Sequence, residues 1–182
     1  MEAKKRTVSK RVTTVLMLAL AAALCLSLVA CGKSDEDVVR EGVTKELEEL
    51  KNLDDATLDL LIGSAAANFE ASGIDSKEFF RAWLDGFDYS VDKVSVNGNT
   101  ATASVTITCK QMGDIMEKFE ASRSGLTQEE RAEQDGSLLM SATRETSKKT
   151  TSIDLPCIKN GNTWNLSPAS MTELNKALEG SK

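Results

Sequence analysis

The stretch YSVDKVSVNGNTATASVTITC, residues 89–109, sets the architecture of this 182-residue chain. From Ala101 to Cys109, apolar and hydroxyl side chains alternate at every position, which is typical of a strand with one buried face. Tyr89 to Val96 has the composition of a partner strand, and Asn97-Gly98-Asn99 is typical of a tight hairpin turn. The stretch therefore predicts an antiparallel hairpin with one face in the core.

A second hairpin is predicted near the C-terminus. Residues 150–159 alternate, with Ile153, Leu155 and Cys157 on the apolar side. The Asn-Gly-Asn triplet returns at 160–162, and Trp164 begins the returning strand. Pro156 lacks a backbone donor, so we expect its strand to lie at an edge or to be irregular there.

Helical spacing of apolar residues fills the rest of the chain. We expect helices at 36–52, 55–72, 75–86 and 112–124, another from 127, and a last one at 170–178. Capping patterns precede three of them, as in Asp75-Ser76-Lys77-Glu78. The order predicts an α+β domain, in which an antiparallel sheet from two hairpins packs against N-terminal and intervening helices.

The N-terminal segment has the three parts of an export signal. Five Lys or Arg residues lie within residues 1–11, and an uncharged apolar run follows from Val15 to Ala30. The segment Leu28-Val29-Ala30-Cys31-Gly32 resembles the lipobox of bacterial lipoproteins. The resemblance implies that Cys31 receives a diacylglyceryl group and becomes the mature N-terminus. We therefore expect a signal peptide at 1–30, a lipidated tether at 31–37 and a single α+β domain at 38–182.

Charge and composition exclude several kinds of function. The chain has a formal charge of −6, and the signal holds five cations and one anion, which leaves −10 on the remaining 152 residues. Such a surface repels nucleic-acid phosphates and anionic lipid headgroups. The chain has no His, which removes the commonest general base and the usual zinc ligand. We expect no nucleic-acid partner, no cofactor, no metal site and no catalytic residues.

The mature chain also resembles small lipoproteins of Gram-positive bacteria that carry a domain of unknown function, grouped loosely with NTF2-like or cystatin-like folds. The resemblance lies in the lipobox, in residues 79–96, in the strand that ends at Cys109, and in residues 154–164. It implies an NTF2-like or cystatin-like sheet, although an NTF2-like domain has more strands after its helices. The family supplies no catalytic residues.

Three groups of residues are candidates for a site. Cys109 and Cys157 both lie on the apolar side of a strand, in a compartment where disulfides persist, so they form either a disulfide or two free core thiols. A set of aromatic and Met residues either lines an apolar pocket or, as we favour, packs in the core. The acids near both helix starts could bind calcium, but their spacing favours helix capping. The aromatic and Met residues are Phe79, Phe80, Trp83, Phe87, Met112, Met116, Phe119 and Trp164. The acids are Asp35, Glu36, Asp37, Asp54, Asp55 and Asp59.

Together these features predict a lipid-anchored protein on the extracytoplasmic face of a cell membrane. We expect a non-enzymatic module that binds an envelope protein or a small apolar ligand. An envelope enzyme that uses carboxylates or Lys, and a structural accessory lipoprotein, are the alternatives.

Overall fold

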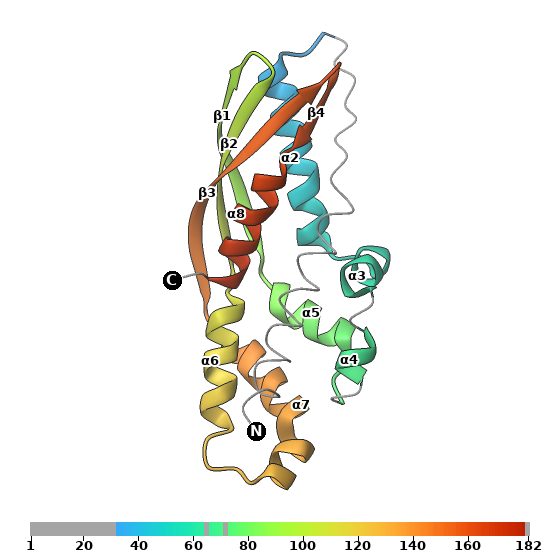
Figure 1. Ribbon diagram of the computed structural model, residues 1–182, viewed down its shortest axis with the longest axis vertical. Helices are drawn as coiled ribbons and strands as arrows, with labels where there is room; N and C mark the ends of the chain where they lie inside the picture. Colours follow the sequence, from blue (N-terminus) through green and yellow to red (C-terminus); the bar gives the residue numbers. More distant parts are fainter. Residues whose placement is uncertain (1–31, 64–65, 71–72, 181–182) are drawn as a thin grey trace.

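The computed structural model describes residues 32–63, 66–70 and 73–180. Four antiparallel strands form one sheet in the order β1-β2-β3-β4, and helices pack against one of its faces (Figure 1). This arrangement is the α+β fold that the sequence predicts. The elements are α2 (Asp35–Asn52), α3 (Asp55–Ile62), α4 (Ala66–Glu70), α5 (Ser76–Leu84), β1 (Asp88–Asn97), β2 (Thr100–Lys110), α6 (Met112–Ser122), α7 (Gln128–Glu145), β3 (Lys148–Asn160), β4 (Thr163–Leu166) and α8 (Pro168–Glu179).

The first hairpin forms at the predicted turn, and Gly98 takes the positive φ of 58° that this turn requires. Between Val91 and Lys93 the register shifts, so Asp92 is an extra residue in a β-bulge. The Arg40 guanidinium, from α2, donates a hydrogen bond to the Val91 carbonyl oxygen. The bulge and this contact interrupt the outer edge of β1.

The second hairpin joins the first through β3, which pairs with β2 over eleven residues. Pro156 lies opposite Thr102 in this ladder, where its missing N–H costs nothing. Its carbonyl oxygen accepts bonds from the Ser167 backbone and the Ser170 hydroxyl, on the side away from β2. The N–H and C=O of a strand residue point the same way, so the absent donor would also have pointed away from β2.

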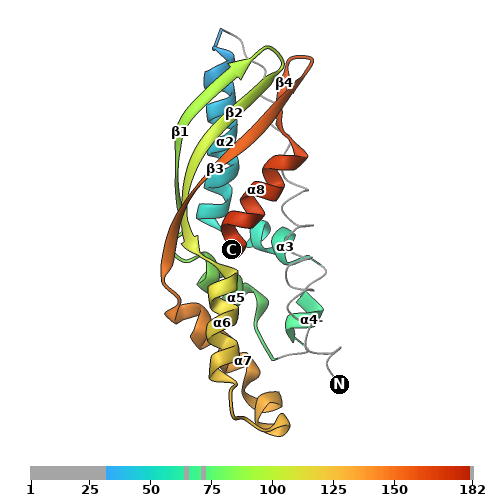
Figure 2. The ribbon, with the colours of Figure 1, turned by 60° about the vertical axis from the view of Figure 1, so that its left-hand side comes forward.

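The core lies between the sheet and the helices α2 and α8, which pack on the same face (Figures 1 and 2). The inward residues of β2 are all buried, as their alternation predicts. An aromatic group adds to the core around α5, where Trp83 donates from its indole nitrogen to the Lys110 carbonyl at 2.9 Å. The Lys110 ammonium is buried and donates to the Ala82 carbonyl at 2.8 Å, near the C-terminal end of α5.

The elements form an elongated molecule with two distinct ends. Both hairpin turns and the start of α2 lie at one end, and the loop between α6 and α7 lies at the other (Figures 1 and 2). The Lys159 backbone N–H donates to the Asn99 carbonyl at 2.8 Å, which ties the two turns together. No helix in the described ranges has both the length and the apolar character needed to cross a membrane.

Several boundaries differ from the sequence prediction. The helix expected at 55–72 is interrupted, because α3 ends at Ile62 and Gly63 takes φ 43° and ψ −127°. The last helix begins at Pro168, where the fixed φ of proline suits the first helical turn. The helix α2 already begins at Asp35, so residues 35–37 of the predicted tether belong to the folded domain.

Candidate functional site

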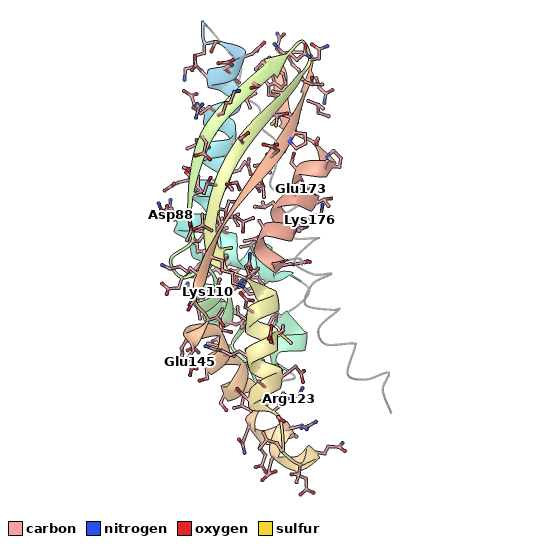
Figure 3. The ribbon with its side chains drawn as sticks, turned by 90° about the vertical axis from the view of Figure 1, so that its left-hand side faces the viewer. Asp88, Lys110, Arg123, Glu145, Glu173 and Lys176 are labelled. Carbon is pink, nitrogen blue, oxygen red and sulfur yellow. The ribbon has the colours of Figure 1, made fainter. Side chains whose placement is uncertain are left out.

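The face of the sheet opposite the helices is a candidate interaction surface. No helix of the described part of the chain lies across it, as Figure 3 shows from this side. The strand register aligns its outward residues in five rows across β1, β2 and β3, and we call this surface the open face. The rows are Asp88, Thr108 and Thr150; Ser90, Thr106 and Ser152; Lys93, Ser104 and Asp154; Ser95, Thr102 and Pro156; and Asn97, Thr100 and Ile158.

Hydroxyl groups of the open face bond to one another across the strands. The hydroxyls of Thr108 and Thr150 lie 2.9 Å apart, and Ser104 donates to the Asp154 carboxylate at 2.7 Å. Cross-strand pairs of this kind each stabilise a sheet by roughly 0.2–1 kcal/mol. The side chains are therefore held in fixed positions while they stay open to solvent.

The bulge residue Asp92 adds a fixed negative charge to the open face. Its carboxylate accepts hydrogen bonds from Ser90 at 2.6 Å and from Thr106 at 2.7 Å. These two bonds hold the pKa of Asp92 below its ordinary value. Asp88 is paired with Lys51 of α2 at 2.8 Å, so Asp92 and Asp154 against Lys93 leave the open face with a small net negative charge.

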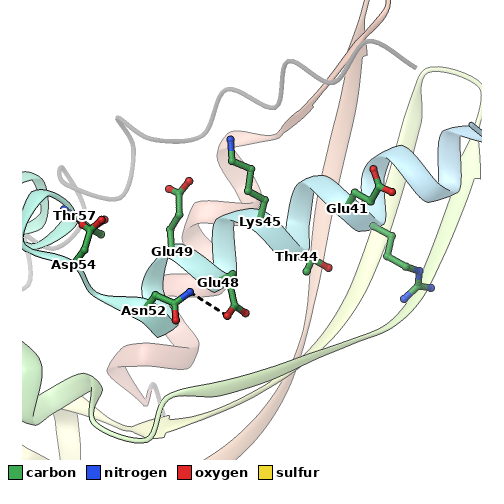
Figure 4. Close-up of a pocket in the computed structure, with 9 residues that line it drawn as sticks. Glu41, Thr44, Lys45, Glu48, Glu49, Asn52, Asp54 and Thr57 are labelled. Atoms are coloured by element: carbon green, nitrogen blue, oxygen red, sulfur yellow. Dashed lines mark hydrogen bonds between the residues drawn. The ribbon is translucent and has the colours of Figure 1, made fainter. Parts of the chain in front are cut away.

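A second candidate is a surface groove of about 620 Å³ along α2. Figure 4 shows that Lys45 and Glu49 project from one side of α2, whereas Thr44 and Glu48 project from the other. Polar side chains that converge on one point are the mark of a small-molecule site, and these diverge. The lining residues are Arg40, Glu41, Thr44, Lys45, Glu48, Glu49, Asn52, Asp54 and Thr57.

Several groove residues have structural partners. Tyr89 donates its hydroxyl to the Glu48 carboxylate at 2.7 Å, and burial together with this bond raises the pKa of Tyr89 to about 12. Asp54 caps α3 by accepting from the Thr57 backbone at 2.7 Å, a bond that lowers the pKa of the Asp54 carboxyl. We therefore read these residues as links between α2, α3 and the sheet.

One buried carboxyl stands out on the same helix. Glu46 is 9 % exposed, and burial raises its pKa to about 7, with the nearby Glu49 charge adding to the effect. An ionised carboxylate is poorly solvated there, so Glu46 opposes folding when it is charged. Sequence reasoning missed this group, although Glu46 lies three residues after Val43 and four before Leu50, which is the spacing of the buried stripe of α2.

The aromatic and Met candidates lie in the core, as favoured from their spacing. Phe79, Phe80 and Trp83 are 1–2 % exposed and contact one another edge to face. The remaining members are also buried, with Met116 partly so. These side chains fill the core, and none of them lines the groove along α2.

The acidic candidates act mainly at helix ends. Asp35, Glu36 and Asp37 form the first turn of α2, where negative charge is favourable, and Asp55 has the same place in α3. Asp59 pairs with Lys77 at 2.7 Å. Among the described residues, no three Cys, Asp or Glu side chains are grouped so that they could hold a metal ion.

The two cysteines are free thiols in the structure, so the disulfide alternative is wrong. They lie on neighbouring strands, but the register pairs Cys109 with Lys149 and Cys157 with Ala101. Eight positions along β3 separate Cys157 from Lys149, which is about 27 Å at the rise of a strand. A disulfide needs Cα atoms within about 7 Å. Burial raises the pKa of each thiol to about 11.

Comparisons with known proteins add little to this geometry. No protein-family model matches the sequence, and no curated protein matches it. Among solved structures the chain is similar to a candidate lipoprotein, ycdA from Bacillus subtilis subsp. subtilis str. 168, with a TM-score of 0.43 and 14 % identity. The match covers 97 % of this chain and 59 % of that chain, so this chain spans about three fifths of the other's length. The predicted lipid site, Cys31, lies outside the described residues.

Proposed function

We propose that this chain is exported, lipidated on Cys31 and retained on the extracytoplasmic face of the membrane, where it binds another protein without catalysing a reaction. The single observation that favours protein binding is the open face. It extends over three strands with its side chains fixed, while the helices occupy the opposite face.

The size and shape of the open face suit a polypeptide partner. Five rows over three strands cover about 400–500 Å² at ordinary strand spacings. Small molecules are usually held in concave pockets, whereas a stable protein interface buries about 800 Å² on each partner. The open face therefore supports a contact of the small, transient class.

Charge indicates the chemistry of that partner. Asp92 and Asp154 outnumber Lys93 on the open face, where Asp88 is already paired with Lys51, and the chain beyond the signal carries −10. Electrostatic complementarity accelerates encounter and suppresses partners of like charge. We therefore infer a polypeptide surface that carries positive charge and hydrogen-bonding side chains.

Membrane retention is tested with Cys31→Ser in the full chain. We expect loss of lipid labelling and release from the membrane fraction, because this substitution replaces only the acylated sulfur with a hydroxyl. Retention and labelling equal to those of the unmodified chain would refute the lipid anchor.

Protein binding is tested with a photo-crosslinking residue at position 102 of the anchored protein in its native membrane. We expect a defined adduct that Ser104→Arg abolishes, because Ser104 lies on the open face and the substitution adds bulk and positive charge there. The matched control places the cross-linker at position 117, on an exposed part of α6. Absence of an adduct at 102, or the same adducts from both positions, would refute the open face as the binding surface.

A further inference from the structure

The end of the molecule that holds both hairpin turns is also the end nearest the predicted anchor. Cys31 is bonded directly to Gly32, and only Gly32, Lys33 and Ser34 separate it from the start of α2. Three residues reach at most about 11 Å. If Cys31 is acylated, this end of the fold therefore lies at the headgroups of the bilayer.

An ion pair and a hydrogen bond connect the start of α2 to the second hairpin. The Asp35 carboxylate accepts hydrogen bonds from the Lys159 ammonium at 2.7 and 2.8 Å and from the Trp164 indole nitrogen at 3.0 Å. The Lys159 ammonium also lies 5.4 Å from the centre of the Trp164 ring. These bonds hold the pKa of Asp35 low and keep the carboxylate ionised. The start of α2 and the second hairpin are consequently held together.

The hairpin turns at this end differ from the rest of the acidic molecule. Both turns are exposed and uncharged, since each is Asn-Gly-Asn. The cations Lys33 and Lys159 are paired with Glu41 and Asp35. Ile158, two residues before the second turn, is the one large apolar side chain among the described residues that is exposed, at 38 %. Glu36 and Asp37, in the first turn of α2, are exposed acids at this end, whereas the two turns and Ile158 carry no charge that headgroups would repel.

We propose that this end, defined by residues 97–99, residues 160–162 and Ile158, is a footprint that rests on phospholipid headgroups and holds the anchored protein upright. The inference rests on the proposed lipid anchor. It places the loop between α6 and α7 farthest from the membrane (Figure 1). The open face then stands perpendicular to the bilayer, accessible from the side.

Upright and flat postures differ in the thickness of the protein layer. The strand β2 has 11 residues and α6, which continues in the same direction, has 11. At their ordinary rises they span about 37 and 16 Å, so an upright layer is about 50 Å thick. A molecule lying on its side presents one sheet and one helix layer, about 20 Å.

Neutron reflectometry on a supported bilayer measures this thickness. The full mature chain, residues 31–182, is coupled through Cys31 to a maleimide lipid in a phosphatidylcholine bilayer with phosphatidylglycerol. Coupling is selective because Cys109 and Cys157 are buried and burial raises their pKa. This chemical anchor makes the result independent of acylation in the cell, which Cys31→Ser tests separately.

We expect a layer of about 50 Å that begins at the headgroups. The double variant Asn99→Asp and Asn162→Asp adds two negative charges to the footprint, so we expect a water gap to open beneath the layer or the layer to tilt and thin. The control, Ser124→Asp and Gln128→Glu, adds the same charge at the far end and should leave the profile unchanged. Circular dichroism checks that each variant folds. A layer of about 20 Å, or the same change from both variants, would overturn the proposal.

Discussion

Glu46→Gln should stabilise the protein, and it should do so only above acidic pH. The substitution keeps the size of the side chain and removes a charge that the native state solvates poorly. Burial raises the pKa of Glu46 from 4.5 to about 7 in the folded state, so protons bind the native chain more tightly than the unfolded chain. Wild-type stability therefore falls, relative to the variant, as pH rises through this window.

The magnitude follows from the same pKa. A rise from 4.5 to about 7 corresponds to a ceiling of about 3 kcal/mol, and local relaxation around the carboxylate reduces it, so we expect about 1–3 kcal/mol. The difference should be near zero at pH 4, grow between pH 4.5 and 7, and stay constant above that. Below pH 4.5 the carboxyl is protonated in both states, and the two chains differ only by an acid and an amide.

Urea unfolding followed by tryptophan fluorescence at pH 4 to 8.5 provides the measurement, because Trp83 and Trp164 are both buried in the folded chain. The control is Glu117→Gln, an exposed acid on α6, whose difference from wild type should stay within about 0.5 kcal/mol at every pH. Parallel stability curves for wild type and Glu46→Gln across the whole range would refute the assignment of a buried, poorly solvated carboxyl.

Three further results are expected. Without any reductant, Cys109 and Cys157 should not react with a thiol reagent at pH 8 in the folded chain, and both should react in denaturant. A mass lower by two hydrogens, with neither of these two thiols reactive in denaturant, would show the disulfide instead. Ile107→Ala truncates a fully buried side chain and should lower the free energy of unfolding in urea by about 2–5 kcal/mol. The control, Thr106→Ala, changes the next residue along β2, which points outward, and should lower it by less than about 1 kcal/mol. Arg123→Met removes the two hydrogen bonds, of 2.7 and 2.8 Å, from the guanidinium to Asp135 in α7. Amide hydrogen exchange in the first half of α7 should become faster while β2 stays protected. Unchanged exchange in α7 would contradict a restraining role for Arg123.

The local features of the fold could be read from the sequence because they depend on neighbouring residues. The alternation through β2 gave the buried face without error, and the Asn-Gly-Asn triplets marked both turns. Thr127 and Glu130 form the capping box that their spacing predicts. Hydrophobic periodicity also assigned Trp83 and Phe119 to the core.

Features that depend on how segments align could not be read in this way. Alternation shows that Cys109 and Cys157 share a face but not which residues they oppose, and the register of β2 on β3 separates them by eight positions. The interruption at Gly63 was missed because apolar residues continue at helical spacing beyond it. The rows of the open face depend on the same register, although the hydroxyl residues of β2 were visible as its polar side.

The bulge at Asp92 has a consequence for crowding. Lipid-anchored proteins share a two-dimensional surface, where neighbouring copies meet far more often than in bulk solution. A straight outer strand would offer its free N–H and C=O groups to the same strand of another copy, and sheets could join into filaments. Here the bulge at Asp92 bends β1, and the Val91 carbonyl oxygen already accepts a hydrogen bond from Arg40. The outer edge of β1 is therefore a poor template for pairing with another copy. On the proposed lipid anchor, this edge of the sheet would therefore not join copies that are crowded on a bilayer.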